Sequence, residues 1–162
     1  MNMGKMPLTG VGATAEHSKL LADSYRRWTG RDLVPGESNG CGGGMDLSEK
    51  LFNAPQVILS HGTETDPVLN YGNQTALDLW EMDWEQLTST PSRLTAEPME
   101  RAERDRFFTQ VTAHGYVDDY TGIRISSTGR RFYIMNATVW NLVDEQGIYR
   151  GQAATFREYK YI

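Results

Sequence analysis

The sequence predicts an α+β domain in which one antiparallel sheet is covered by helices on one face. Two observations predict this class. Strand-like segments come first as a pair and later as a set of three, with helical segments between the two groups. Only short turns separate the last three strands, and turns this short join antiparallel neighbours, because parallel strands need a crossover of about a dozen residues or more.

An amphipathic helix is expected within residues 14–34, ahead of all the strands. Leu21, Tyr25 and Trp28 recur at helical spacing, which gives this segment one apolar stripe. Gly30 follows where a glycine commonly ends a helix in the left-handed conformation. The helix therefore has an apolar face that must pack on this chain's own sheet or on another subunit.

The segments around this helix divide the chain. Residues 1–13 lack hydrophobic periodicity, which predicts a flexible tail. Residues 35–54 contain a glycine run that is costly to order and has no side chains to pack, so we expect a flexible connector with one short helical turn. Because no further change of composition follows, residues 55–162 are expected to form a single domain.

The first strand pair is expected at the start of this domain. Residues 56–60 form a short run rich in β-branched side chains, and residues 68–71 form a second one. Asn73 follows the second run, where its side chain can accept a backbone N–H bond as the N-cap of a helix over residues 74–81. The pattern predicts a hairpin that leads into a short helix.

A longer helix and a three-stranded meander complete the domain. Pro98 is well placed just inside a helix start, and Gly115 ends the helix. Strand-like segments follow over residues 116–126, 130–143 and 149–156, with turns rich in glycine and polar residues between them. These strands are expected to pair in sequence order.

Charge and hydropathy exclude several kinds of partner. The chain has 16 basic and 21 acidic residues, a net charge of −5, and the two signs are interspersed. A protein that binds a phosphate backbone concentrates positive charge, so we expect no direct nucleic-acid partner. No apolar run approaches the 18 or so residues of a membrane span, and the first residues lack the layout of a secretory signal. We expect a soluble, cytoplasmic protein.

Polar residues within the long strands are the most informative feature for function. Strict alternation along residues 130–143 places one mostly apolar set on a single face, namely Phe132, Ile134, Asn136, Thr138, Trp140 and Leu142. We expect this face to point toward the core. Because a buried amide must find hydrogen-bond partners, Asn136 either ties neighbouring elements together or points into a ligand cavity.

Aromatic and polar residues from the helices and strands are candidates for lining such a cavity, which would suit an aromatic or acidic metabolite. The alternative is that the aromatic residues simply fill the core. The candidates are Trp80, Trp84, Phe107, Tyr116, Tyr120, Arg124, Asn136, Thr138 and Trp140.

Catalytic motifs are absent from the sequence: it contains no nucleophile elbow, zincin motif, Walker A loop or dinucleotide-binding fingerprint. Asp118 and Asp119 are the carboxylates that a small isomerase-like enzyme of cone-shaped α+β fold could use in a pocket. Adjacent strand residues point to opposite faces, however, and cannot act as a pair. If one is buried, Arg124 or Arg131 is its expected partner. We expect no enzyme.

Several stretches carry a family resemblance and together span about residues 17–157. They are residues 24–31 (SYRRWTGR), 60–73 (SHGTETDPVLNYGN), 76–81 (ALDLWE), 91–98 (PSRLTAEP), 122–127 (GIRISS) and 137–142 (ATVWNL). In these stretches and in its element order, the chain resembles the MEKHLA branch of PAS-like domains. The resemblance implies a five-stranded antiparallel sheet with a core that sometimes holds a small ligand. It also implies a role in sensing or in dimerisation.

The resemblance also raises the question of a cofactor, whose identity the sequence leaves unknown. Photoactive flavin domains of this kind carry a reactive cysteine on a helix after the first strand pair, whereas Cys41 lies upstream in the glycine run, so we exclude cysteinyl–flavin photochemistry. Gln152 lies on the last strand, where such domains present an amide to flavin, and it joins the pocket candidates. His17, His61 and His114 are not convincing haem ligands, and His61 is expected in a solvated turn without a metal.

The leading hypothesis is a sensory or regulatory module that binds a small molecule or a protein partner and forms a homodimer. One alternative is the cone-shaped enzyme with a pocket carboxylate. The other is a purely structural dimerisation domain whose core is closed.

Overall fold

The computed structural model describes residues 9–35, 46–96 and 98–162 of the chain. Most of the expected flexible tail and the glycine run with Cys41 lie outside the described residues.

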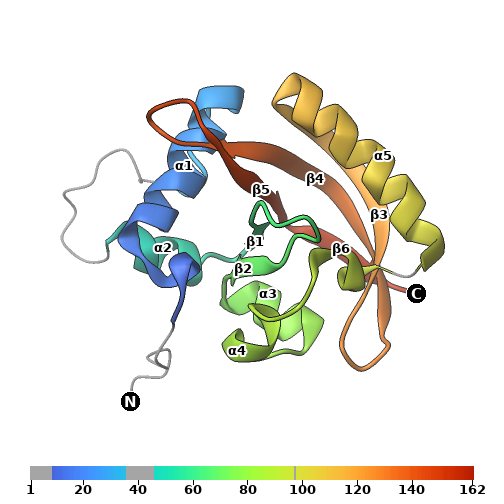
Figure 1. Ribbon diagram of the computed structural model, residues 1–162. Coiled ribbons are helices and arrows are strands. Elements are labelled where there is room, and N and C mark those ends of the chain that lie inside the picture. The colour runs from blue at the N-terminus through green and yellow to red at the C-terminus, as the bar shows by residue number, and fades with distance from the viewer. Residues whose placement is uncertain (1–8, 36–45, 97) are drawn as a thin grey trace, which may run out of the picture.

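One antiparallel sheet organises the domain (Figure 1). Its spatial order is β2-β1-β5-β4-β3, so the predicted pair and the predicted set of three meet where β1 lies beside β5. A sixth strand, β6, follows β5 and pairs with the first half of β4. The strands are β1 (Val57–His61), β2 (Leu69–Gly72), β3 (Tyr116–Ile125), β4 (Arg131–Val143), β5 (Tyr149–Phe156) and β6 (Glu158–Tyr161).

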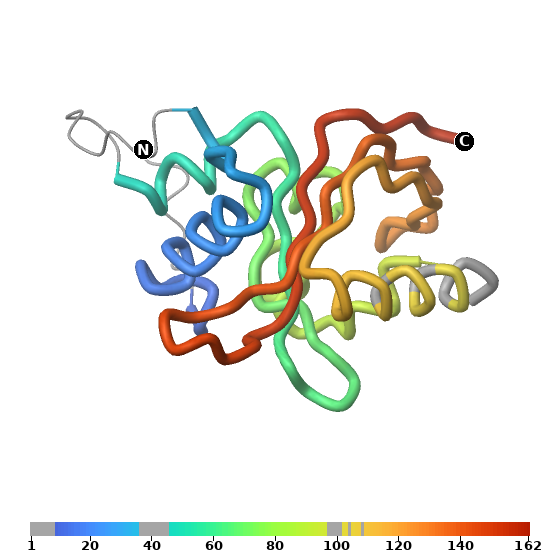
Figure 2. The backbone as a smooth tube through the Cα atoms, turned by 90° about the horizontal axis from the view of Figure 1, so that it is seen from above, coloured from blue at the N-terminus to red at the C-terminus, as the bar shows by residue number. Residues whose placement is uncertain are grey.

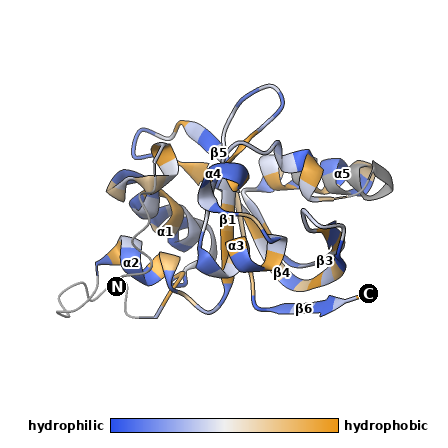
Figure 3. Cartoon of the chain, turned by 90° about the horizontal axis from the view of Figure 1, so that it is seen from below, coloured by the Kyte–Doolittle hydropathy of each residue, from blue (hydrophilic) through white to orange (hydrophobic). Residues whose placement is uncertain are grey.

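The strand β6 was not predicted from the sequence. All four of its residues are exposed, and Figure 3 shows it as a largely hydrophilic ribbon at the margin of the domain. Its charged and aromatic residues do alternate, but four residues next to β5 and the chain's last residue are too short a run to mark a separate strand.

Helices lie on both faces of the sheet, whereas the sequence predicted a cover on one face. Trp84 and Leu87 of α4 share a core with residues of α1 and α2. Figures 1 and 2 show α1 and α5 on opposite sides of the long strands β4 and β5. The helices are η1 (Val11–Ala13), α1 (Ala15–Thr29), α2 (Leu47–Phe52), α3 (Gln74–Trp80), α4 (Trp84–Leu87), η2 (Ser92–Thr95) and α5 (Pro98–His114).

Asn73 is the N-cap of α3, as predicted, and also a buried junction. Its Oδ1 accepts from the N–H groups of Ala76 and Ile58 at 3.1 Å, and its Nδ2 donates to the carbonyls of Leu51 and Gln56. The side chain is fully buried. One amide therefore ties together α2, β1 and the start of α3.

Buried polar contacts hold α1 against its own sheet. The Ser24 hydroxyl donates to the carbonyl of Val143 and accepts from its N–H, at 3.1 and 2.9 Å. The indole N–H of Trp28 donates to the carbonyl of Asn141 at 2.9 Å. The sequence leaves open whether α1 packs on its own sheet or on another subunit. In the structure it packs on its own sheet.

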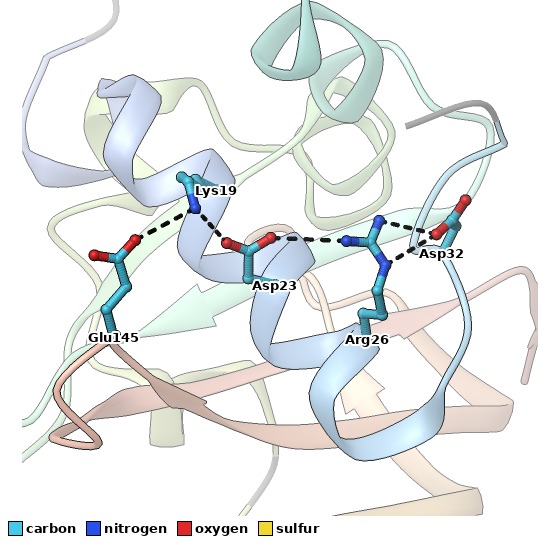
Figure 4. Close-up of polar contacts among 5 residues, drawn as sticks. All are labelled: Lys19, Asp23, Arg26, Asp32 and Glu145. Carbon is cyan, nitrogen blue, oxygen red and sulfur yellow. Dashed lines mark hydrogen bonds and ion pairs between the residues drawn. The ribbon is translucent and has the colours of Figure 1, made fainter. Parts of the chain in front are cut away.

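The outward side of α1 carries a row of ion pairs (Figure 4). Lys19 lies 2.7 Å from Asp23 and 3.5 Å from Glu145, which belongs to the turn between β4 and β5. Arg26 lies 2.9 Å from Asp32. Exposed pairs of this kind contribute between about 0 and 1 kcal/mol each, so the buried side of the helix supplies most of its attachment.

Residues 9–13 depart from the expected tail because they pack on the domain. Gly12 is buried, and a Cβ atom on it would overlap the backbone carbonyl of Asn70. The indole N–H of Trp84 donates to the carbonyl of Thr9 at 2.9 Å.

Two backbone irregularities change which residues of β4 face α3. Asp119 and Asn136 have positive φ angles of 62° and 53°, in the left-handed region that aspartate and asparagine tolerate better than most residues. The pairing of β3 with β4 shifts register there, as at a β-bulge. Beyond the bulge, Ala137 and Val139 take over the face that Ile134 holds before it.

The strict alternation expected along residues 130–143 is therefore wrong. Trp140 lies on the opposite face, under α1, where its ring meets that of Tyr25 edge-on at 4.9 Å. Asn136 itself is exposed and donates to Glu158 at 2.7 Å, so it is not a buried tie, and it lies at an open surface pocket rather than between the sheet and α3.

Candidate ligand-binding site

A small cavity lies between the sheet and the helices that follow β2. Its volume is about 30 Å³, which leaves space for roughly two water molecules at about 10–15 Å³ of such volume each. The residues around it come from β1, β3, β4, β5, α3 and η2. They are Leu59, His61, Trp80, Ser92, Thr95, Tyr120, Arg124, Ile134, Val139, Gln152, Ala153, Ala154 and Phe156.

Apolar side chains make up most of the wall. Leu59 of β1, Val139 of β4 and Phe156 of β5 come from neighbouring strands, and Trp80 comes from α3. The Trp80 ring meets Phe156 edge-on with centroids 6.3 Å apart. Because Ser60, next to Leu59, instead bonds to His17 of α1, the alternation along β1 separates the cavity face from the α1 face.

Arg124 is the charged group of the cavity, and it is 6% exposed. Its guanidinium donates to the carbonyl of Ile123 at 2.8 Å and to the hydroxyl of Tyr120 at 3.2 Å, and it lies over the Tyr120 ring. Among the described residues, no carboxylate forms an ion pair with it. A buried guanidinium held only by neutral acceptors is uncommon, because a buried charge is normally paired.

Gly122 makes the space for this guanidinium. A Cβ atom at Gly122 would lie 2.6 Å from the Tyr120 hydroxyl and 3.1 Å from Nη1 of Arg124. The missing side chain thus lets Arg124 reach back along β3 to Tyr120.

The indole N–H of Trp80 is a second polar group among the residues that line the cavity. It is 2% exposed, and its indole N–H has no hydrogen-bond acceptor within the described part of the chain. A buried donor without an acceptor costs about 1–3 kcal/mol.

His61 and Gln152 line the cavity on the side of α5. His61 is 8% exposed, and its Nδ1 donates to the carbonyl of Gly62 at 2.9 Å. The expectation of a solvated turn at His61 was wrong, because β1 extends through this residue. Gln152 donates to Oδ1 of Asn141 at 3.0 Å, and Asn141 donates to the carbonyl of Val111 in α5. A polar chain therefore runs from the cavity to α5.

Of the candidates named from the sequence, Trp80, Tyr120, Arg124 and Gln152 lie together around the cavity. The others lie elsewhere in the structure. Phe107 stacks on the Tyr120 ring from α5, Trp84 packs against Tyr71, Tyr116 pairs with Trp140, and Thr138 donates to Asp118.

The apolar wall was not singled out from the sequence. Leu59, Val139, Ala154 and Phe156 alternate with residues that face α1, so the period of two along β1 and β5 was the available signal. Ser92 and Thr95 belong to a single helical turn, η2, and no sequence pattern marks them as cavity residues.

The two adjacent carboxylates lie away from this cavity. Asp118 is exposed, pairs with Arg31 at 3.3 Å and accepts from Thr138, so its partner is neither Arg124 nor Arg131. Asp119 is also exposed. Neither provides the pocket carboxylate that the enzyme alternative requires.

The described residues contain no group of three or more histidine, cysteine, aspartate or glutamate side chains that could hold a metal ion. Within 9–35, 46–96 and 98–162, no helix is both long and apolar enough to span a membrane.

Solved structures of similar fold are PAS and Light-Oxygen-Voltage domains. A PAS domain from Colwellia psychrerythraea has a TM-score of 0.56 and 12% identity, covering 71% of this chain and 92% of that one. A Light-Oxygen-Voltage domain from work on a flavin analogue has a TM-score of 0.57 and 14% identity, covering 72% and 84%. A PAS domain of a LuxR-family regulator from Burkholderia thailandensis, in complex with ethanol, has a TM-score of 0.53 and 16% identity, covering 68% and 96%. At these identities the likeness establishes the fold.

Sequence relatives narrow the family. The homeobox-leucine zipper proteins ATHB-9 and ATHB-14 of Arabidopsis thaliana are 32% and 30% identical over 129 residues, or 78% of this chain. The chain spans only 15% of the length of either relative. The MEKHLA domain model matches residues 15–161. With a PAS-like sheet order and a family match over nearly its whole length, this chain belongs to the MEKHLA domain family.

Proposed function

We propose that this domain is a sensory or regulatory module that binds a small molecule in the cavity beside Trp80 and Arg124. The observation that carries the proposal is a wall of apolar side chains interrupted by a few buried polar groups, which is the usual composition of a small-molecule site. The PAS domain from Burkholderia thailandensis that is in complex with ethanol has the same fold, and ethanol is a molecule of the size that such a small cavity can take.

The fold offers two routes by which binding changes other surfaces. Gln152 and Asn141 connect the cavity to the backbone of α5. On the opposite face, Ser60 connects β1 to His17 of α1, next to the cavity residue Leu59. A ligand that moves β1 or β5 therefore shifts the two helices that lie on opposite faces of the sheet. The proposal assigns no chemical reaction to the domain and no direct contact with nucleic acid.

Cavity filling tests the proposal. Ala154→Leu adds three carbon atoms to the wall of the cavity, whereas Thr121→Ala changes an exposed residue of β3 outside it. A thermal-shift screen of small organic molecules should find compounds that raise the Tm of the wild type and of Thr121→Ala but not of Ala154→Leu. Compounds that raise the Tm of all three proteins equally would bind elsewhere, and the proposal would be wrong.

Dimerisation forms the second part of the proposal, and β6 is the surface that favours it. Within the described part of the chain, β6 pairs only with β4, so its outer edge is open. Tyr159 and Tyr161 of β6 are 43% and 39% exposed. A second copy of β6, paired antiparallel about Tyr159, places Glu158 opposite Lys160 of the partner subunit, and opposite charges across a strand pair are favourable. The apolar face of α1, in contrast, is already packed on its own sheet.

Light scattering coupled to size-exclusion chromatography tests this part. The wild type should elute as a dimer, and Lys160→Glu, which places like charges opposite each other, should elute as a monomer with an unchanged Tm. A monomeric wild type at high protein concentration would contradict the dimer.

A further inference from the structure

Two of the polar side chains that line the cavity, Arg124 and Trp80, are hydrogen-bond donors only. Arg124 supplies a guanidinium with five N–H groups, of which the structure shows one donating to a carbonyl and one to a hydroxyl. Trp80 supplies an indole N–H that lacks an acceptor in the described structure. Of the described residues that line the cavity, none is acidic. The cavity thus holds one positive charge, and none of its described lining residues supplies a negative one.

This imbalance has an energetic consequence. Burying a charge without a counter-ion is unfavourable, because the neutral acceptors replace only part of the hydration that the charge has lost. Arg124 is nevertheless buried, and Gly122 provides the space that it needs. An anion that enters from solution would supply the missing charge and the missing acceptors together.

We infer that the cavity binds a small monocarboxylate anion, with its carboxylate on Arg124 and its short hydrocarbon chain against the apolar wall; this inference rests on the ligand-sensing function proposed above. The planar guanidinium matches two carboxylate oxygens in one plane. The indole N–H of Trp80 is a further donor for a carboxylate oxygen. Leu59, Val139 and Phe156 provide the surface for a chain of a few carbon atoms.

Phosphate fits the same site less well. It carries up to two negative charges and four oxygen atoms, whereas the lining contains one arginine and a mostly apolar wall. Because the volume of about 30 Å³ corresponds to about two water molecules, the smallest carboxylates are the expected ligands, and affinity should fall from acetate to butyrate.

Isothermal titration calorimetry with sodium acetate, propionate and butyrate, against sodium chloride of equal ionic strength, tests the inference on the full chain. Propanol and propionamide are the neutral probes of matched size. We expect saturable binding of the carboxylates and weaker binding of the neutral probes. Arg124→Met should weaken carboxylate binding by roughly 10- to 100-fold, the factor that corresponds to losing hydrogen bonds to a charged group.

The control variant is Arg150→Met, which removes an exposed arginine that pairs with Asp144 at the far end of β5. It should bind carboxylates as the wild type does. The Tm without ligand separates a binding role of Arg124 from a structural one. If Arg124 serves a ligand, Arg124→Met keeps or raises this Tm, because a buried unpaired charge is removed. A lower Tm with unchanged carboxylate affinity would assign Arg124 a structural role and overturn the inference.

The outcomes also separate this inference from the proposed function. If neutral probes bind as tightly as carboxylates, and Ala154→Leu abolishes their binding, the cavity is a ligand site but not one for anions. If no probe binds, or if every probe binds Ala154→Leu and the wild type equally, both the carboxylate inference and the cavity function fail.

Discussion

His17 of α1 and Ser60 of β1 are joined by a buried hydrogen bond of 2.9 Å. The Ser60 hydroxyl donates to Oδ1 of Asn70 at 2.6 Å, so it accepts from Nε2–H of His17. The imidazole is 4% exposed and lies beside the ring of Tyr71. The N-terminal helix is therefore attached to the sheet through a buried histidine side chain.

This attachment predicts a pH-dependent stability. Burial lowers the pKa of His17 from 6.5 to about 4. Between pH 6.5 and pH 4 the unfolded chain binds a proton at His17 that the folded chain does not. The free energy of unfolding is therefore unaffected by protonation of His17 above pH 6.5 and decreases as the pH falls toward 4. At pH 5 the loss from this group should be about 2 kcal/mol relative to pH 7.

Urea unfolding at pH 7 and pH 5 measures this effect. His17→Gln keeps a polar side chain without a group that titrates in this range, and it should lose about 2 kcal/mol less than the wild type between the two pH values. Equal losses in the two proteins would show that His17 is not the titrating group.

Tyr25 provides a second test of how α1 is attached. Its ring packs on Trp140 and is 8% exposed, so Tyr25→Ala should lower the free energy of unfolding by about 3 kcal/mol. Lys19→Ala, in the exposed ion-pair row of the same helix, should change it by less than about 1 kcal/mol. Similar effects of both changes in urea unfolding would contradict a helix held by its buried side.

Asn73 differs from an ordinary helix cap because it also joins α2 and β1. Asn73→Ala removes the cap and leaves buried backbone groups of Leu51, Gln56 and Ile58 without this partner, so we expect a loss of at least about 3 kcal/mol. Asp83→Ala removes the same kind of cap from α4 at an exposed position, with an expected loss of about 1 kcal/mol. Thermal unfolding measures the loss of stability in both variants. Equal losses would mean that the contacts of Asn73 with α2 and β1 contribute no stability beyond that of the helix cap.

Gly122→Ala tests the placement of Arg124 without altering its charge. The new Cβ atom conflicts with the Tyr120 hydroxyl and with Nη1, so the guanidinium must move. Propionate affinity should fall by roughly tenfold, the equivalent of about 1.4 kcal/mol. Thr121→Ala, the exposed neighbour, should bind as the wild type does. Undiminished affinity of Gly122→Ala in calorimetry would show that the guanidinium position does not matter.

The larger elements of this fold could be predicted because each has a local signal. The helix of Leu21, Tyr25 and Trp28 has a periodic apolar stripe, Asn73 caps a helix, and short turns separate the last three strands. The cavity depends on details without such a signal. The left-handed conformations of Asp119 and Asn136 shift the pairing of two strands, and they reverse the faces of Thr138 and Trp140.

The site was therefore predicted only in part. Trp80 and Arg124 were recognised by residue type, since an aromatic ring and a strand arginine stand out in a sequence. His61 was not predicted as a cavity residue, because β1 continues beyond the β-branched residues from which the strand was recognised and includes His61. That Arg124 is buried without a carboxylate partner follows from the packing of β3, and no pattern in the sequence contains this information.

The most direct test of a ligand cavity beside Trp80 follows the indole N–H signals of the four tryptophans by ¹H–¹⁵N NMR during a propionate titration. The Trp80 signal, assigned from its loss in Trp80→Phe, should move with saturation because its free N–H gains an acceptor. The Trp84 signal should stay in place, since that N–H already donates to the carbonyl of Thr9, away from the cavity. A Trp80 signal that does not move at saturating propionate, or four signals that drift together without saturation, would contradict the account.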